Sequence, residues 1–315
     1  MPAILVPPVS EDAGLRADYE RTPHEVNEYW TAERQTDALP FDPLTPGDTG
    51  GAGLADTATG ILVDPTSGPV HPDGAQLPET DDGNAFTATG LAAGTQGRLY
   101  MSFPDGDYVC SATVVNSAGN NVVATAAHCI WDMTNDAFAD YVVFVPADAN
   151  DGAVAPYGQW YADSIILPDA FATGAEEHSD GRIYGDGWAY DFAFLTIAPD
   201  DEGRLIEDVV GGQGIAFGVP AEELVVIGYP SAEPFDGLSQ RYCAADDWER
   251  WDYAYSLPCV MTGGSSGGGW LTNYDPAVGA GYLVATTSFG DDWSLGAAPL
   301  GATALSLFTE IGGME

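Results

Sequence analysis

The chain has 315 residues and carries 48 acidic side chains against 8 basic ones, a formal net charge of −40 at pH 7. All eight basic residues are arginines, and lysine is absent. A chain this acidic repels phosphate backbones and anionic lipids, so neither nucleic acid nor a membrane surface is an expected partner. Hydrophobic residues make up 45% of the chain and aromatic residues 11%, which is enough to build a packed core.

Two interpretations of the acidic surface remain open at this point. The first is a solvated coat that keeps the protein dispersed in water. The second is adaptation to high salt, because at about 1 M salt the Debye length falls to about 3 Å and repulsion between carboxylates is screened.

The first residues of the chain do not resemble a secretion signal. Residues 1–14 contain only a short apolar run, which no cationic residue precedes and which prolines interrupt. No stretch of the chain approaches the roughly 20 apolar residues that a membrane-spanning helix needs.

Residues 1–94 differ in composition from the rest of the chain. They are rich in Pro, Gly, Asp and Thr, with turn-forming clusters at residues 40–43 and 79–83. Residues 10–37 contain few helix breakers, and the pattern predicts a helix there with Ser10 or Asp12 as its cap. We expect the remainder of this region to be a loosely structured extension.

From about Gly94 onward, short apolar runs alternate with turn residues. The runs are rich in Val, Ile, Tyr and Thr, and their spacing is typical of an all-β barrel or sandwich. A Leu- and Ala-rich segment, Ala298 to Ile311, predicts a closing helix. The clearest predicted strands are residues 108–115, 121–126, 141–146, 192–197, 224–228 and 282–288.

Three local patterns in this second region carry residues suited to catalysis. Residues 125–129 read Thr-Ala-Ala-His-Cys, residues 191–195 read Asp-Phe-Ala-Phe-Leu, and residues 263–269 read Gly-Gly-Ser-Ser-Gly-Gly-Gly. Each pattern alone has an ordinary structural explanation. The histidine could simply be hydrogen-bonded at a strand end, the aspartate could be a turn residue, and the glycine- and serine-rich run could be a flexible loop. Their occurrence together, in the order His, Asp, Ser, favours a catalytic interpretation.

The chemistry of these residue types explains why they belong together. A serine hydroxyl is a weak nucleophile until an imidazole takes its proton. The imidazole needs a buried carboxylate on its other nitrogen to fix its tautomer and to stabilise the imidazolium. Glycines allow a sharp backbone turn in which successive N–H groups converge on a developing oxyanion.

On these motifs, the region from residue 95 to residue 315 resembles the chymotrypsin-like (trypsin-like) serine peptidases, and within them secreted bacterial members related to the glutamyl endopeptidases. The resemblance implies a two-barrel catalytic domain with a C-terminal helix, and it makes residues 1–94 a propeptide-like extension. It implies that His128 is the general base, Asp191 its orienting acid and Ser266 the nucleophile. The N–H groups of Gly264 and Ser266 would form the oxyanion hole. Ser265 is the alternative nucleophile, but the family pattern places the nucleophile directly before a Gly-Gly pair.

The four cysteines allow three disulfide pairings. The resemblance implies Cys110–Cys129 beside the histidine, and Cys243–Cys259 then follows. Two structural disulfides favour an oxidising compartment, and therefore a secreted protein.

The region departs from its animal digestive relatives in ways that concern activation and specificity. Ser265 stands where those relatives have the aspartate that pairs with a new N-terminus, so that activation switch does not carry over. The base of the primary substrate pocket falls at about Val260, where relatives that select Lys or Arg have an aspartate.

The pocket wall corresponds to residues 287–290, and glutamyl relatives have a histidine where Thr287 stands. We therefore expect a small or apolar residue before the cleaved bond. The predicted pocket residues are Val260, Thr287, Ser288, Phe289 and Gly290.

These observations predict a secreted, monomeric serine endopeptidase that acts on polypeptides and needs no cofactor. Histidines and cysteines at the short spacing of a zinc site are absent from the sequence, so no metal site is predicted. Ca²⁺ at Asp105 and Asp107, or in the loop of residues 180–186, is the alternative to solvated acidic turns, which are favoured. The extension is expected to cover the cleft until it is removed. A non-catalytic binding protein on the same scaffold and an esterase that uses the same triad remain the alternatives.

Overall fold

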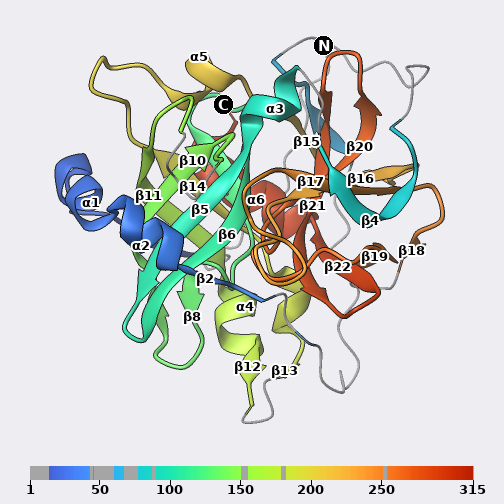
Figure 1. The fold of residues 1–315 in the computed structure, drawn as a ribbon, viewed down its shortest axis with the longest axis horizontal. Coiled ribbons are helices and arrows are strands. Elements are labelled where there is room, and N and C mark those ends of the chain that lie inside the picture. Colours follow the sequence, from blue (N-terminus) through green and yellow to red (C-terminus); the bar gives the residue numbers. More distant parts are fainter. Residues whose placement is uncertain are drawn as a thin grey trace.

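The computed structural model describes residues 14–42, 45, 60–66, 77–86, 90–149, 155–178, 182–250 and 254–314. Two β structures lie side by side, one built mainly from residues 96–197 and the other from residues 214–299 (Figure 1). Among the helices of these residues, none is long and apolar enough to cross a membrane.

The first β structure is a closed antiparallel barrel. Strand β10 returns to β5, and β11 pairs with both β10 and β14, so the sheet has no free edge along this circuit. The strands in their order around the barrel are β5 (Gln96–Phe103), β6 (Gly106–Val115), β7 (Val122–Thr125), β14 (Ala193–Ile197), β11 (Trp160–Pro168) and β10 (Asp140–Pro146).

The second β structure is a mainly antiparallel sheet whose long central strand is β21 (Ala280–Gly290). Strand β15 (Gly214–Phe217) joins β21 in parallel. The remaining strands of its main path are β18 (Glu249–Arg250), β19 (Tyr255–Pro258), β22 (Ser294–Pro299), β20 (Gly269–Asp275), β16 (Leu224–Gly228), β17 (Arg241–Ala245) and β4 (Thr80–Ala85).

Short elements connect these strands. They are β8 (Trp131–Asp132), β9 (Ala137–Phe138), β12 (Glu176–Glu177), β13 (Ile183–Tyr184), the 3₁₀ turn η1 (Gly187–Tyr190), and the helices α3 (Leu91–Thr95), α4 (Asp169–Gly174) and α5 (Ile206–Val210).

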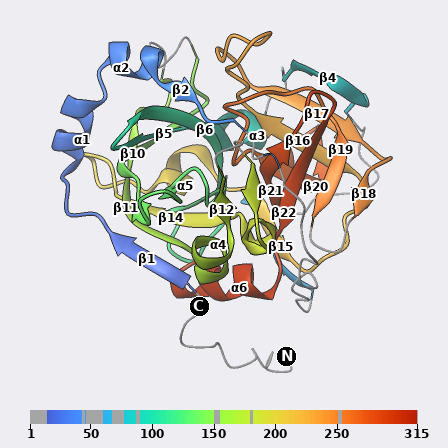
Figure 2. The same ribbon diagram turned by 90° about the horizontal axis from the view of Figure 1, so that it is seen from below.

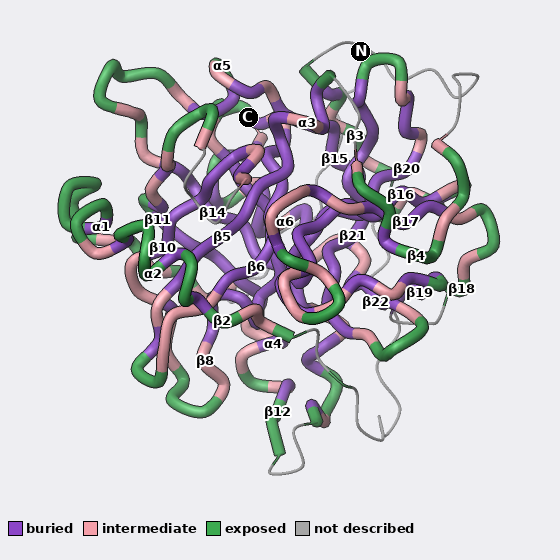
Figure 3. The backbone as a smooth tube through the Cα atoms, viewed as in Figure 1, coloured by how far each residue is buried: buried purple, intermediate pink, exposed green. Residues whose placement is uncertain are grey.

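The C-terminal helix α6 (Ala302–Glu310) packs against both β structures, as Figure 2 shows from below. The ring of Phe308 on this helix lies 5.4 Å from the ring of Phe194 in β14 and 5.4 Å from that of Phe217 in β15. Because one buried aromatic side chain contacts strands from both halves, the helix fixes how the halves meet. The central strands of both β structures are buried along most of their length, whereas β4, β12 and β18 are largely exposed (Figure 3).

The all-β prediction is confirmed, and each of the six predicted strands matches an observed strand to within a few residues. The closing helix is also confirmed, although it begins at Ala302 rather than Ala298. Strands β11, β20 and β22 were not among the clear predictions.

The predicted single helix over residues 10–37 is wrong for its described part. Residues 14–18 form strand β1 (Gly14–Asp18), and two short helices follow, α1 (Pro23–Tyr29) and α2 (Ala32–Asp37). The threonines at residues 22 and 31 cap the two helices, and proline occupies the first turn of α1, where its missing N–H costs nothing. Residues 10–13, which include both predicted caps, lie outside the described residues.

The described parts of the extension form short strands that pair with strands of both β structures. Strand β1 pairs with β11, and β2 (Leu39–Pro40) pairs in parallel with β6. Strand β3 (Ile61–Val63) pairs with β15, and β4 pairs with β17. In Figure 2 the segment from β1 to β2, in blue, wraps the outer side of the first barrel. These segments are therefore ordered by pairing with strands that lie far away in the sequence.

A buried carboxylate on α5 makes a prediction about stability. Glu207 is only 7% exposed, and it accepts hydrogen bonds from the hydroxyl and the backbone N–H of Ser117. Burial raises the pKa of Glu207 from 4.5 to about 7. Between these two pH values the folded state keeps a proton that the unfolded state has released, so this group makes the free energy of unfolding fall as pH rises through the window.

We expect Glu207→Gln, which mimics the protonated acid, to be more stable than the wild type at pH 8 by up to about 3 kcal/mol. Near pH 5 the difference should largely disappear. Urea denaturation of both proteins at the two pH values measures this effect. A difference in unfolding free energy that does not change with pH would contradict the assignment.

Candidate active site

His128 and Asp191 meet beside the ends of two paired strands of the first barrel. His128 follows β7 and Asp191 precedes β14. These two strands pair with each other, with Thr125 opposite Ala193. The imidazole Nδ1 lies 2.7 Å from Asp191 Oδ2, and the backbone N–H of His128 donates to Oδ1 at 2.9 Å. Both side chains are fully buried. The carboxylate therefore holds the ring through two separate hydrogen bonds.

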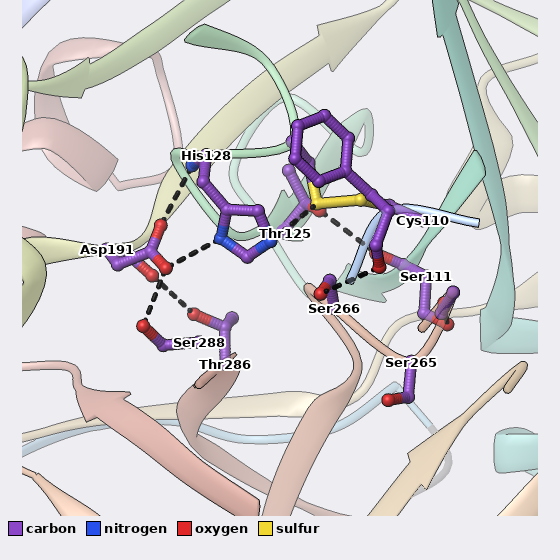
Figure 4. Close-up of a disulfide and its surroundings, with 12 residues drawn as sticks. Cys110, Ser111, Thr125, His128, Asp191, Ser265, Ser266, Thr286 and Ser288 are labelled. Carbon is purple, nitrogen blue, oxygen red and sulfur yellow. Dashed lines mark hydrogen bonds and ion pairs between the residues drawn. A yellow bond between two sulfur atoms is a disulfide. The ribbon is translucent and has the colours of Figure 1, made fainter. Parts of the chain in front are cut away.

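The second sheet also contacts this carboxylate. The Ser288 hydroxyl, from β21, donates to Asp191 Oδ2 at 2.6 Å. The Thr286 hydroxyl donates to the Asp191 backbone carbonyl at 3.2 Å. Figure 4 shows these groups converging on Asp191 from the side opposite His128. Sequence reasoning placed Ser288 only in the wall of the substrate pocket and missed this contact.

The two adjacent serines of the glycine-rich loop have different surroundings. The Ser265 hydroxyl donates to the Thr262 carbonyl at 2.6 Å, so its proton is engaged within the loop. Ser266 lies on the side of His128, whereas the Ser265 side chain turns away from the imidazole (Figure 4). Gly264 and Gly267 have φ of +92° and +77°, a region that favours glycine.

Ser111 in β6 ties this loop to the first barrel. Its hydroxyl donates to the Gly264 carbonyl at 2.8 Å, and its backbone N–H donates to the Ser266 carbonyl at 2.7 Å. It also accepts a hydrogen bond from the Tyr229 N–H at 2.9 Å. Sequence reasoning missed Ser111. The available signal was a serine inside an apolar strand directly after Cys110, since a buried hydroxyl must find partners.

A backbone carbonyl from the extension lies in this site. The Phe41 oxygen accepts a hydrogen bond from the Gly264 N–H at 2.8 Å and another from the Ser266 hydroxyl at 3.3 Å. The Phe41 ring meets the His128 ring edge-on, with centroids 5.3 Å apart. Ser266 Oγ and His128 Nε2, both described, form no hydrogen bond with each other.

The predicted substrate pocket corresponds only in part to a cavity of about 460 Å³ beside the glycine-rich loop. Val260 and Gly290 line this cavity. Thr287 instead accepts a hydrogen bond from the buried Trp270 indole at 2.9 Å, and Phe289 packs on Trp188 with ring centroids 5.0 Å apart. The described lining contains four carboxylates and no cationic side chain. Its residues are Asp42, Thr45, Ala232, Glu233, Pro234, Val260, Met261, Thr262, Gly263, Gly290, Asp291, Asp292 and Leu295.

Both disulfides that the resemblance implied are present. Cys110–Cys129 joins β6 to the residue after His128, and Cys243–Cys259 joins β17 to the segment that leads into the glycine-rich loop. Within the described residues, the one cluster with metal-binding side chains is Cys110, His128 and Cys129. Because its two sulfurs are bonded to each other, they offer no thiolate to a metal.

Residues 110–279 match a family model described as a trypsin-like peptidase domain. A comparison with curated protein sequences finds no match.

Three solved structures illustrate the likeness in fold. The protease Anisep from Arthrobacter nicotinovorans is 28% identical, with a TM-score of 0.62, over 72% of this chain and 98% of that one. A thermostable serine protease AL20 from an extremophilic microorganism is 27% identical, with a TM-score of 0.57, over 70% and 97% of the two chains. A Glu endopeptidase at 16% identity and a TM-score of 0.53, over 74% and 97%, shares the fold alone.

The hydrogen bonds around Asp191 predict the effect of removing its charge. Asp191→Asn keeps the shape, but its amide group must donate where the carboxylate accepts, so the imidazole is forced toward the wrong tautomer. We expect turnover to fall by about 10⁴-fold, with little change in the melting temperature. Steady-state hydrolysis of a small ester, alongside thermal unfolding, measures both effects. Activity within about tenfold of the wild type would show that Asp191 does not orient the base.

Proposed function

The chain belongs to the trypsin-like peptidase family and is a serine endopeptidase, and we propose that His128, Asp191 and Ser266 carry its catalysis. The observation that carries this assignment is the buried, hydrogen-bonded pair of His128 and Asp191, with the Ser266 side chain on the side of the imidazole (Figure 4). The position of Ser265, whose proton is held by Thr262, supports Ser266 as the nucleophile.

In the proposed reaction, His128 Nε2 takes the Ser266 proton as the hydroxyl oxygen attacks the carbonyl carbon of the substrate. The N–H groups of Gly264 and Ser266 stabilise the negative oxygen that develops. The Gly264 N–H already donates to a carbonyl oxygen in this structure, which supports that role. His128 then donates its proton to the leaving amine, and water hydrolyses the Ser266 ester.

We further propose that the enzyme works outside the cell. Two disulfides brace the site, one beside His128 and one before the glycine-rich loop, and such bonds persist in oxidising compartments.

Labelling with a fluorophosphonate probe tests the nucleophile. Exhaustive labelling of the full chain, followed by peptide mapping, should modify Ser266 alone. Ser266→Ala should abolish labelling and peptide hydrolysis, since no hydroxyl remains to form the ester. Ser265→Ala is the matched control and should reduce turnover only in part. Labelling that survives in both variants would refute the assignment. A failure to label Ser266 in both the wild type and Phe41→Ala, with both proteins folded, would favour a binding protein.

Substrate preference follows from the cavity beside the loop. Val260, Met261 and Leu295 give it apolar surface, while its carboxylates repel acidic side chains. We therefore propose cleavage after small or apolar residues and discrimination against Glu and Asp. Mass-spectrometric digestion of a peptide library measures this preference. A digest in which most cleavage follows Lys, Arg or Glu would overturn the proposed preference.

A separate comparison of casein with a short ester as substrate distinguishes peptidase from esterase activity.

A further inference from the structure

A segment of the chain itself already occupies the proposed catalytic cleft. The Phe41 carbonyl oxygen accepts a hydrogen bond from the Gly264 N–H at 2.8 Å. This N–H is the donor assigned above to the oxyanion. The same oxygen accepts a second hydrogen bond, from the Ser266 hydroxyl, at 3.3 Å. A substrate carbonyl needs the same Gly264 donor, so substrate and Phe41 cannot bind at once.

The Phe41 side chain lies in a pocket of aromatic rings beside the catalytic histidine. Its ring centroid is 5.0 Å from that of Tyr108, 5.3 Å from that of His128 and 6.2 Å from that of Phe103. These separations are typical of favourable edge-on and tilted aromatic pairs. A cavity of about 420 Å³ adjoins this pocket, and its lining combines apolar side chains such as Trp131 and Ile183 with carboxylates such as Asp132 and Glu177. The aromatic contacts are therefore those of the pocket itself, beside His128.

Backbone pairing holds the segment in this position. Strand β2 pairs with β6, with Leu39 opposite Tyr108 and Pro40 opposite Val109, and the Phe41 N–H donates to the Val109 carbonyl at 2.9 Å. The recognition is therefore that of an added strand, in which backbone hydrogen bonds fix the register and one side chain fills a pocket.

The helices before β2 anchor the same segment to the barrel. Trp30, at the end of α1, is 2% exposed and packs in a cluster with Tyr100 and Val143. Arg34, on α2, forms an ion pair of 2.6 Å with Asp107 at the start of β6. Since α2 ends two residues before β2, these contacts place Phe41 at the cleft.

The hydrogen-bond geometry is that of an inhibitor rather than of a substrate about to react. Attack requires the Ser266 proton to pass to His128, yet this proton is donated to the Phe41 oxygen. The bound carbonyl thus diverts the nucleophile from its base.

We propose that Phe41 is the central residue of a built-in inhibitor, and that the pocket formed by Phe103, Tyr108 and His128 is a subsite for an aromatic side chain. Phe41 fills this subsite in the intact chain, and an aromatic residue of another peptide fills it once the segment has left. This inference rests on the proposed function of Ser266.

The test compares full-length wild type with Phe41→Ala and with Leu62→Ala, a control on β3 whose side chain is 51% exposed. Removing the ring weakens the closed state, and we expect ester hydrolysis and the initial rate of fluorophosphonate labelling to rise about 10- to 100-fold. Leu62→Ala should match the wild type. Circular dichroism and the melting temperature confirm that each variant is folded, and Phe41→Leu, which should give a smaller rise, replaces Phe41→Ala if that variant unfolds.

A peptide tests the subsite directly. A synthetic peptide of residues 36–42, Thr-Asp-Ala-Leu-Pro-Phe-Asp, should inhibit the Phe41→Ala enzyme competitively. The same peptide with Ala in place of Phe should inhibit at least tenfold more weakly, because the ring supplies most of the apolar contact.

The outcomes separate this inference from the proposed function. If Phe41→Ala is no faster than Leu62→Ala while Ser266 is labelled in both, the built-in inhibitor is refuted and the catalytic assignment stands. If both peptides inhibit equally, the aromatic subsite is refuted. If no folded variant is ever labelled at Ser266, the proposed function itself fails.

Discussion

A buried carboxylate joins the two β structures of this enzyme. Asp191 is fully buried, and a buried charge is tolerated only where hydrogen bonds replace the water that it has lost. Here the donors are the backbone and ring of His128, from the first barrel, and the hydroxyl of Ser288, from the second sheet. The two halves must therefore meet in one relative position, and that position also brings the glycine-rich loop to His128.

The glycine-rich loop depends on the same junction. It belongs to the second sheet by sequence, yet its two carbonyls at Gly264 and Ser266 are held by Ser111 of the first barrel. A Cβ atom on Gly267 would lie 2.2 Å from the Thr125 hydroxyl, so this close approach requires glycine. The loop conformation is thus determined by contacts between the halves rather than by the flexibility of its glycines.

The sequence predicted what local patterns encode. Alternating apolar runs gave the strands, and the surroundings of His128, Asp191 and Ser266 were specific enough to suggest that they share a site. Long-range pairing was less accessible, because β1 and β2 are short and each pairs with a strand that lies far away in the sequence. The position of Phe41 in the site could not be predicted from the sequence. Its carbonyl accepts hydrogen bonds from Gly264 and Ser266, more than 200 positions away, and no sequence motif marks such a residue. Ser288 was predicted as a wall residue because its strand was recognised, whereas its side-chain partner depends on packing.

The Phe41 segment is covalently part of the molecule that it occupies. A tethered ligand competes at an effective concentration, on the order of millimolar for a short flexible link, that is a property of the chain and not of the solution. Dilution, which separates an enzyme from a free inhibitor, leaves such an occupant in place. Under the proposed inhibition, dilution alone does not activate the chain, and proteolysis starts only when the segment is cut or displaced.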